Sequence, residues 1–213
     1  MFAIRTAARL IAWLWTRTRP TVLFFGRATR GRFLPVLDQV AARRQPFTLQ
    51  TTITGYPRAI DSQVPLPAPV IRTLATITRD HGPEVMVWRY DPILLTGHLT
   101  TAWHRRNFAG LAARLTPLTD EVVVSFAHLY AKSTRNLAAA GIAWRKPPVD
   151  EKRALLADFG AHQRQPVRLL LRQKPRYRVY DSCVHGCTYC HAVRALAAAL
   201  ARRAAHVATV DRL

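Results

Sequence analysis

Residues 84–91 read Glu84-Val-Met-Val-Trp-Arg-Tyr-Asp91, and this stretch decides the predicted fold. Its centre is almost continuously apolar and rich in Val, Trp and Tyr, side chains that favour β-strands. Such a run is typical of a strand buried on both faces of a parallel sheet. Pro92, which cannot donate a backbone hydrogen bond, is expected to stop the strand. Because parallel strands need long crossovers, the stretch predicts a helix on each side of it.

The same alternation extends in both directions along the chain. Further strands are predicted over residues 21–25, 47–54, 121–127 and 167–171. Apolar residues recur at helical spacing between them, which predicts helices over 33–40, 70–77, 103–115, a segment ending at Gly141, and 150–160. Gly141 is expected at the C′ position of its helix, and Asp150 is expected to cap the last one. Strands alternating with helices predict an α/β fold with a parallel sheet.

The number of βα units limits the architecture. A closed eight-unit barrel typically takes about 250 residues, and this chain of 213 residues offers only four or five units. We therefore expect a partial, incomplete TIM-like βα barrel. Four segments are predicted in chain order. They are a basic N-terminal extension over 1–20, the partial barrel over 21–160, a basic connector over 161–176, and a cysteine-cluster loop with a C-terminal helix over 177–213.

Composition and charge restrict the class of protein. The chain is 49% hydrophobic and 21% charged, as globular proteins are, and it has no apolar run near the ~20 residues that span a bilayer. Its net charge of +20 would suit nucleic acid as a possible partner. However, the excess is nearly all arginine and is spread along the chain, as a coding bias would also produce.

The only three cysteines are Cys183, Cys187 and Cys190, at the spacing C-x3-C-x2-C. Three thiols within eight residues cannot form a disulfide framework. We therefore expect a reducing, cytoplasmic environment and a metal.

This spacing favours one kind of metal site. Three thiolates on a short loop can ligate three irons of a [4Fe-4S] cluster and leave the fourth iron open. That is the arrangement of the radical S-adenosylmethionine (SAM) enzymes, in which the open iron binds SAM and an aromatic residue precedes the last cysteine. Tyr189 holds that position and is expected to contact the adenine, and Gly186 would allow the tight bend of the loop.

Two other interpretations of the cysteines stay open. A structural zinc ion could use the three thiolates with His185 or His191 as fourth ligand. Zinc modules usually carry paired C-x2-C knuckles, and only Cys187 and Cys190 have that spacing. Alternatively, the thiols ligate nothing.

Polar residues near the predicted strand ends are candidates for the substrate site. Ligands of parallel α/β folds gather at the carboxyl ends of the strands. Arg89 and Asp91 have the same parity, so both side chains point to one face of the sheet. Together with Tyr56 and Lys132, which follow neighbouring strands, they are the predicted catalytic residues. The alternative for Arg89 and Asp91 is an ion pair that only fixes the strand end.

Five stretches carry a resemblance to a known family. They are "PFTLQTTITGYPRAID", "VMVWRYDPILLT", "NFAGLAARL", "VVVSFAHLYAKSTRNL" and "YRVYDSCVHGCTYC". Across roughly Leu23 to His191, with gaps, the chain resembles a bacterial family known as domain of unknown function 1848. The resemblance implies a radical-SAM-like partial barrel whose cluster is delivered by the C-terminal loop, as if permuted.

The chain departs from the family's pattern in four places. Residues 1–20 have no counterpart of its first strand, and Leu23 to Thr29 read "LFFGRAT" where the family tends to show "FWTKNP". The segment between Gly160 and Tyr177 is shortened, and no Gly-Gly-Glu segment is present. We expect an iron-sulfur protein of radical SAM type with an unknown substrate and an electron donor. The alternatives are a non-enzymatic, zinc-stabilised module that binds nucleic acid, and a decayed, inactive family member.

Overall fold

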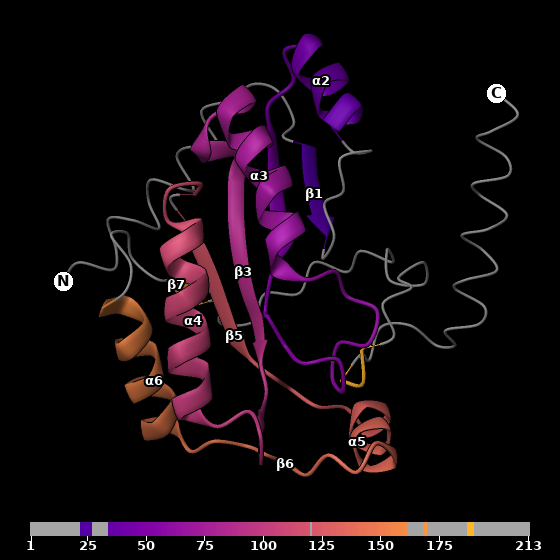
Figure 1. Cartoon of the computed structure of the whole chain (residues 1–213), viewed down its shortest axis with the longest axis vertical. Coiled ribbons are helices and arrows are strands. Elements are labelled where there is room, and N and C mark those ends of the chain that lie inside the picture. The colour runs from indigo at the N-terminus through magenta and orange to yellow at the C-terminus, as the bar shows by residue number, and fades with distance from the viewer. Residues whose placement is uncertain (1–21, 27–33, 120, 162–167, 170–186, 190–213) are drawn as a thin grey trace, which may run out of the picture.

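The computed structural model describes residues 22–26, 34–119, 121–161, 168–169 and 187–189. Five parallel strands form one sheet in the order β1-β2-β3-β5-β7. Their bounds are Val22–Gly26 (β1), Phe47–Thr52 (β2), Met86–Ile93 (β3), Val122–Phe126 (β5) and Arg168–Leu169 (β7). In Figure 1 the arrowheads of β1, β3 and β5 point to the same end of the molecule. We call this end of the sheet the carboxyl edge.

Five α-helices accompany these strands in the described part of the chain: α2 (Leu34–Ala42), α3 (Pro67–His81), α4 (Thr101–Leu115), α5 (Ala131–Ala139) and α6 (Val149–Ala161). A 3-10 turn, η2 (Pro83–Val85), precedes β3, and β4 (Leu95–Thr96) pairs antiparallel with β6 (Trp144–Arg145). The predicted α/β fold with a parallel sheet is confirmed. The small β4–β6 pair was not predicted, because two-residue strands leave no periodic pattern.

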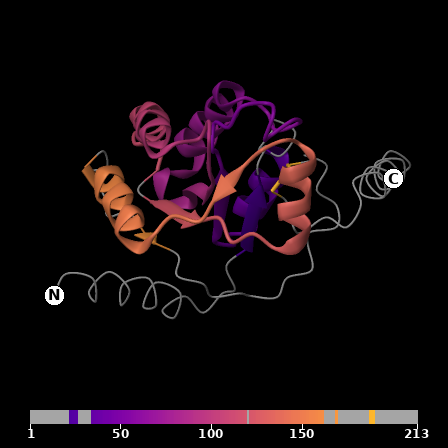
Figure 2. The same ribbon diagram turned by 90° about the horizontal axis from the view of Figure 1, so that it is seen from below.

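Helices α2, α3, α4 and α6 cover one face of the sheet, whereas α5 packs at its carboxyl edge. The strands lie side by side in chain order, and crossovers of the usual right-handed kind bring the helices between them to one side. Four fully buried residues of one apolar core mark this side: Leu37 of α2, Leu74 of α3, Phe108 of α4 and Phe159 of α6. The rings of Phe108 and Phe159 stack at 3.9 Å. Figure 2 shows α3 and α4 together on one side of the strands.

Local sequence explains where α3 and α5 end. Pro67 occupies the first turn of α3, where its missing N–H is not needed, and Gly82 ends the helix at φ +90°. Gly141 follows α5 at φ +67°, and its N–H donates to Ala138 O. Gly141 is therefore the C′ residue that the sequence predicted.

Several boundary predictions were wrong. β3 begins at Met86, after the turn η2, and β2 ends at Thr52 instead of residue 54. β3 does not stop before Pro92 but runs on to Ile93, whose carbonyl accepts a hydrogen bond from Ala127 N at 2.8 Å. The register with β5 shifts between Tyr90 and Ile93, which lets the strand pass a residue that has no N–H. Asp150 lies inside the first turn of α6, not at its cap. There its carboxylate still faces the positive end of the helix dipole.

The opposite face of the sheet, which we call the open face, carries more polar side chains. Burial alternates along β2, so that Gln50 and Thr52 are half-buried there. Val87 and Val123 on the same face are buried, so β3 and β5 are apolar on both faces near their first residues, whereas polar side chains follow further along both strands. The predicted N-terminal extension and C-terminal helix lie outside the described residues, as does the connector apart from β7.

Candidate site at the carboxyl edge

Part of the cysteine motif lies at the carboxyl edge of the sheet. Residues 187–189 contact the loop that follows β2, and they lie beside α5 in both Figure 1 and Figure 2. They belong to a second apolar cluster, distinct from the main core, made of Tyr56, Ile60, Leu94, Leu99, Leu137, Cys187 and Tyr189. Segments about 130 residues apart in sequence are thus packed together. This is the edge where parallel sheets bind ligands.

A turn in the β2 loop receives the cysteine motif. The backbone N–H groups of Ile60 and Asp61 both donate to Pro57 O, at 2.9 and 3.0 Å. The turn then presents Ile60 O, which accepts a hydrogen bond from Thr188 N at 3.2 Å. It also presents the Asp61 carboxylate, which accepts a hydrogen bond from the Tyr189 hydroxyl at 3.0 Å. Both spacer residues of the C-x2-C segment are therefore bonded to this turn.

Asp61 is a buried carboxylate with only 2% of its surface exposed. Its second oxygen accepts a hydrogen bond from Thr54 Oγ1 at 3.1 Å, just beyond the end of β2. Buried charges are normally stabilised by such donors. Asp61 is the last residue of the stretch "PFTLQTTITGYPRAID" but is not among the predicted site residues. A single acidic residue after an apolar one forms no distinctive sequence pattern.

Cys187 is buried in the second cluster, 8% exposed. Cys183, Cys190 and Gly186 lie outside the described residues, and the described residues by themselves contain no group of three or more metal-binding side chains. An apolar shell around a thiolate-bound metal excludes water and tunes its reduction potential. The surroundings of Cys187 therefore fit a sulfur-ligated metal.

Arg89 and Asp91 meet on the open face, as their parity predicted. The Arg89 guanidinium forms an ion pair with the Asp91 carboxylate, and the Ser125 hydroxyl of β5 donates to the other oxygen of Asp91. The two side chains keep 23% and 17% of their surfaces exposed. An ion pair therefore does form, and it remains accessible from the open face.

The other two predicted catalytic residues lie elsewhere. Tyr56 is buried, and its hydroxyl donates to Pro92 O at 2.6 Å and accepts from Leu94 N at 3.0 Å. It links the loops after β2 and β3, and its ring meets that of Tyr189 edge-on at 6.1 Å. Lys132 lies in the first turn of α5 and is half-buried.

A buried polar chain, not anticipated from sequence, connects α4 with the strand ends. Asn107 Nδ2 donates to the Tyr90 hydroxyl at 2.9 Å and to Thr54 O at 2.7 Å. The Tyr90 hydroxyl lies 2.8 Å from His104 Nδ1, and His104 Nε2 lies 3.0 Å from Leu94 O. Since a carbonyl only accepts, Nε2 carries the proton and Nδ1 accepts from Tyr90.

Burial keeps this chain uncharged. Desolvation lowers the pKa of His104 to about 4, even though the hydrogen bond to Leu94 O opposes the shift. Burial likewise raises the pKa of Tyr90 above its ordinary value. His104 and Asn107 are three residues apart on α4, so helical spacing was the one signal that could have paired them.

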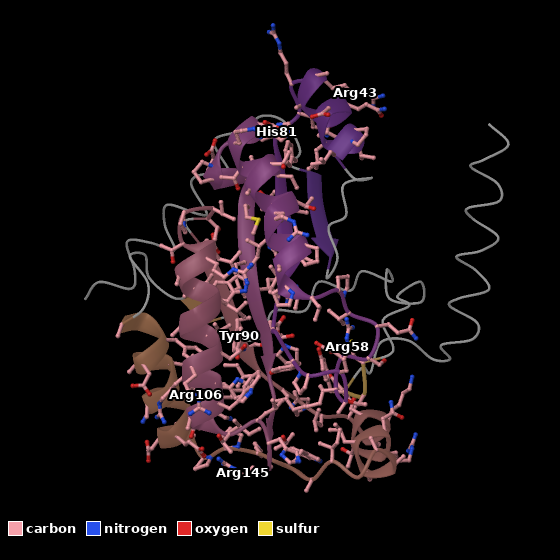
Figure 3. The ribbon with its side chains drawn as sticks, in the orientation of Figure 1. Arg43, Arg58, His81, Tyr90, Arg106 and Arg145 are labelled. Carbon is pink, nitrogen blue, oxygen red and sulfur yellow. The ribbon has the colours of Figure 1, made fainter. Side chains whose placement is uncertain are left out.

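A cavity of about 250 Å³ adjoins the turn that holds the cysteine motif. It lies between the end of β2 and the start of α3, and Thr52, Tyr56, Arg58 and Asp61 are among its lining residues. The Arg58 guanidinium donates to Val64 O at 2.6 Å and so closes the loop around the cavity. Figure 3 shows Arg58 in this loop, close to residues 187–189. The cavity and the cysteine motif thus share Tyr56 and Asp61.

The basic surface is dispersed over the molecule. Arg43 lies at one end of the molecule, whereas Arg106 and Arg145 lie toward the other (Figure 3). Several of these charges are neutralised locally, as in the pairs of Arg105 with Asp158 and of Arg145 with Glu151. Within the described residues, no helix is both long and apolar enough to cross a bilayer.

Fold and site together define a class: a parallel α/β protein with a cysteine loop packed at the carboxyl edge of its sheet. The family model described as "Domain of unknown function (DUF1848)" matches residues 14–169, well over half of the chain. The chain belongs to this family. The cysteine motif follows the matched range. Neither the curated proteins nor the solved structures contain a significant match.

Proposed function

We propose that this chain is an iron-sulfur protein of radical SAM type, with Cys183, Cys187 and Cys190 as the ligands of a [4Fe-4S] cluster. The supporting observation is that Cys187, Thr188 and Tyr189 pack against the β2 loop at the carboxyl edge. A cysteine loop in that place would put a cluster where parallel α/β folds carry out their chemistry.

We further propose that the sheet is an incomplete TIM-like barrel. In barrels of this type the strands follow one another in chain order and the helices form the outer layer. The strand order here and the helices on a single face support that architecture. Arg89, Asp91 and Ser125, on the open face, would then point toward the inside of the curved sheet.

Each residue of the cysteine loop has a separate role in this proposal. The three thiolates would bind the cluster, Gly186 would allow the bend of the loop, and Tyr189 anchors the loop through its hydroxyl. Only 8% of the Tyr189 surface is exposed, so a contact of its ring with the adenine would require this side chain to move. A bound, reduced cluster would supply the one electron needed to cleave SAM into methionine and a 5′-deoxyadenosyl radical able to take a hydrogen atom from a substrate. The second apolar cluster would exclude water from the Cys187 thiolate.

The proposed substrate-binding set keeps Arg89, Asp91, Lys132 and Tyr56. Arg89 presents a partly exposed guanidinium whose orientation is set by Asp91, and Asp91 in turn is held by Ser125. Such a fixed pair can orient a polar group of the substrate without itself changing charge. Lys132 contributes from the first turn of α5 and Tyr56 from the β2 loop.

Metal analysis of the anaerobically purified full chain tests the proposal. We expect about four iron and four acid-labile sulfide per chain. Replacing any of the three cysteines by alanine should remove most of both, whereas Ser182→Ala, a neighbouring substitution outside the ligand set, should leave them unchanged. One zinc ion without sulfide would contradict the proposal. It would instead indicate a zinc-stabilised module, whose affinity for nucleic acid should fall steeply with salt.

The loaded protein allows a separate test of activity. After chemical reduction it should convert SAM to 5′-deoxyadenosine and methionine, measured by liquid chromatography. A fully loaded and reduced protein that forms no 5′-deoxyadenosine would be a decayed family member and not an enzyme.

A further inference from the structure

We infer that Asp61 is the positioning residue of the cysteine loop: its buried carboxylate fixes Tyr189 and, through the adjoining Thr188, the direction of the Cys187 thiol. The statement that Asp61 orients a metal ligand rests on the proposed function. The statement that Asp61 holds the cysteine loop in place does not. The inference starts from a carboxylate that is almost fully buried yet takes part in none of the proposed chemistry.

The hydrogen bonds around Asp61 join three parts of the chain. Thr54 Oγ1, beyond the end of β2, donates to one carboxylate oxygen, and the Tyr189 hydroxyl donates to the other. The hydrogen bond from Thr54 fixes the orientation of the Asp61 carboxylate. The hydrogen bond from Tyr189 to this fixed carboxylate then holds the cysteine motif in place.

Backbone contacts make the attachment specific. Thr188 N donates to Ile60 O, and Thr188 Oγ1 lies 3.4 Å from the same oxygen. With Tyr189 held by the next residue of the turn, both spacers of the C-x2-C segment are fixed. Because Thr188 and Tyr189 are both bonded to the turn, the adjoining Cys187 loses conformational freedom.

The same contacts connect the loop to the cavity. Thr54, Tyr56 and Asp61 line the cavity and also contact, directly or through Asp61, the cysteine segment. Displacing the Asp61 carboxylate would therefore change both the direction of the Cys187 thiol and the cavity wall. This is how residues around a metal site orient its ligands without touching the metal.

Thiol reactivity of the metal-free full chain tests the anchoring without requiring any metal. The rate of Cys187 alkylation by iodoacetamide, measured by peptide mass spectrometry, reports how often the loop opens. We expect Tyr189→Phe and Asp61→Asn to raise this rate about tenfold to hundredfold: Tyr189→Phe removes the hydrogen bond to the carboxylate, and Asp61→Asn replaces one of the two acceptor oxygens by a donor. Tyr189→Phe removes only the hydroxyl and keeps the packed ring. This variant therefore tests whether the bond to Asp61 anchors the loop even if Asp61→Asn fails to fold.

A matched pair of threonine variants separates anchoring from general destabilisation. Thr54→Val removes a buried hydroxyl that bonds Asp61, and Thr119→Val removes one that donates to Met86 O at 2.7 Å, at the opposite edge of the sheet. Thr54→Val should speed Cys187 alkylation about tenfold. Thr119→Val should lower the melting temperature but change that rate less than about twofold.

The outcomes distinguish this inference from the proposed function. Equal Cys187 rates in wild type, Asp61→Asn and Tyr189→Phe would overturn the anchoring, as would an equal rise in Thr119→Val. If the wild type takes up no iron and sulfide, the proposed function fails while the alkylation rates still decide the anchoring. If a cluster forms, its electron paramagnetic resonance g-values should change in Tyr189→Phe and stay unchanged in Thr119→Val.

Discussion

Single residues at the carboxyl edge have well-defined physical roles. Gly55 adopts φ +66° immediately after Thr54, and a Cβ there would lie 2.8 Å from Asn107 Oδ1. His104 is completely buried, accepts a hydrogen bond from Tyr90 and donates one to Leu94 O. These residues hold the strand ends in place, and each leads to a prediction.

Gly55→Ala should destabilise the fold. The left-handed backbone and the contact with the Asn107 side chain both oppose a Cβ, so we expect a loss of about 1–3 kcal/mol in the free energy of unfolding. Gly110→Ala is the matched control, because Gly110 lies within α4 and a Cβ there would meet no atom within 4 Å. That change should be neutral or stabilising by up to about 1 kcal/mol. Urea unfolding of both variants measures the difference, and equal losses would contradict the account.

Stability should depend on pH through His104. Its folded pKa of about 4 lies below the unfolded value of 6.5, so between these values the unfolded chain binds more protons. The free energy of unfolding should therefore fall as pH drops through this window, by about 3 kcal/mol in total, and be fully restored above it. His104→Gln should lack this part of the pH dependence. Urea titrations between pH 4 and 7 test this, and parallel curves for both proteins would refute it.

At the scale of elements, the strands were easier to predict than the site. The runs at 84–91 and 121–127 have apolar, β-branched and aromatic centres and were found nearly in full as β3 and β5. The error at Pro92 arose because a register shift is a property of two strands together, which one strand's sequence does not encode. The pairing of Arg89 with Asp91 could be anticipated from parity alone. The Asp61–Tyr189 contact could not, because it joins residues 128 positions apart.

Helix α6 is held in the main core by Leu155 and by Phe159, whose ring stacks on Phe108 of α4. Phe159 is fully buried against Phe108, so Phe159→Ala should lower the free energy of unfolding by about 3–5 kcal/mol. Val149→Ala in the same helix removes a side chain that is 58% exposed and should cost less than about 0.5 kcal/mol. Chemical denaturation of the two variants measures both values. Similar losses would show that α6 does not pack as described.

For the whole molecule, the arrangement concentrates polar groups on one face and one edge. Helices α2, α3, α4 and α6 bury one side of the sheet, which leaves Arg89, Asp91 and Ser125 on the other. The loops after β2 and β3 meet residues 187–189 at the carboxyl edge. The cavity lies at the same edge and shares Tyr56 and Asp61 with the surroundings of the cysteine motif.

The central claim is that three cysteines hold a [4Fe-4S] cluster with one iron open to SAM. Electron paramagnetic resonance of the reduced, anaerobically loaded chain, recorded with and without SAM, tests it most directly. The account predicts the signal of a reduced [4Fe-4S] cluster whose g-values shift when SAM is added. A cluster signal that SAM leaves unchanged, or a protein that carries only zinc, would contradict it.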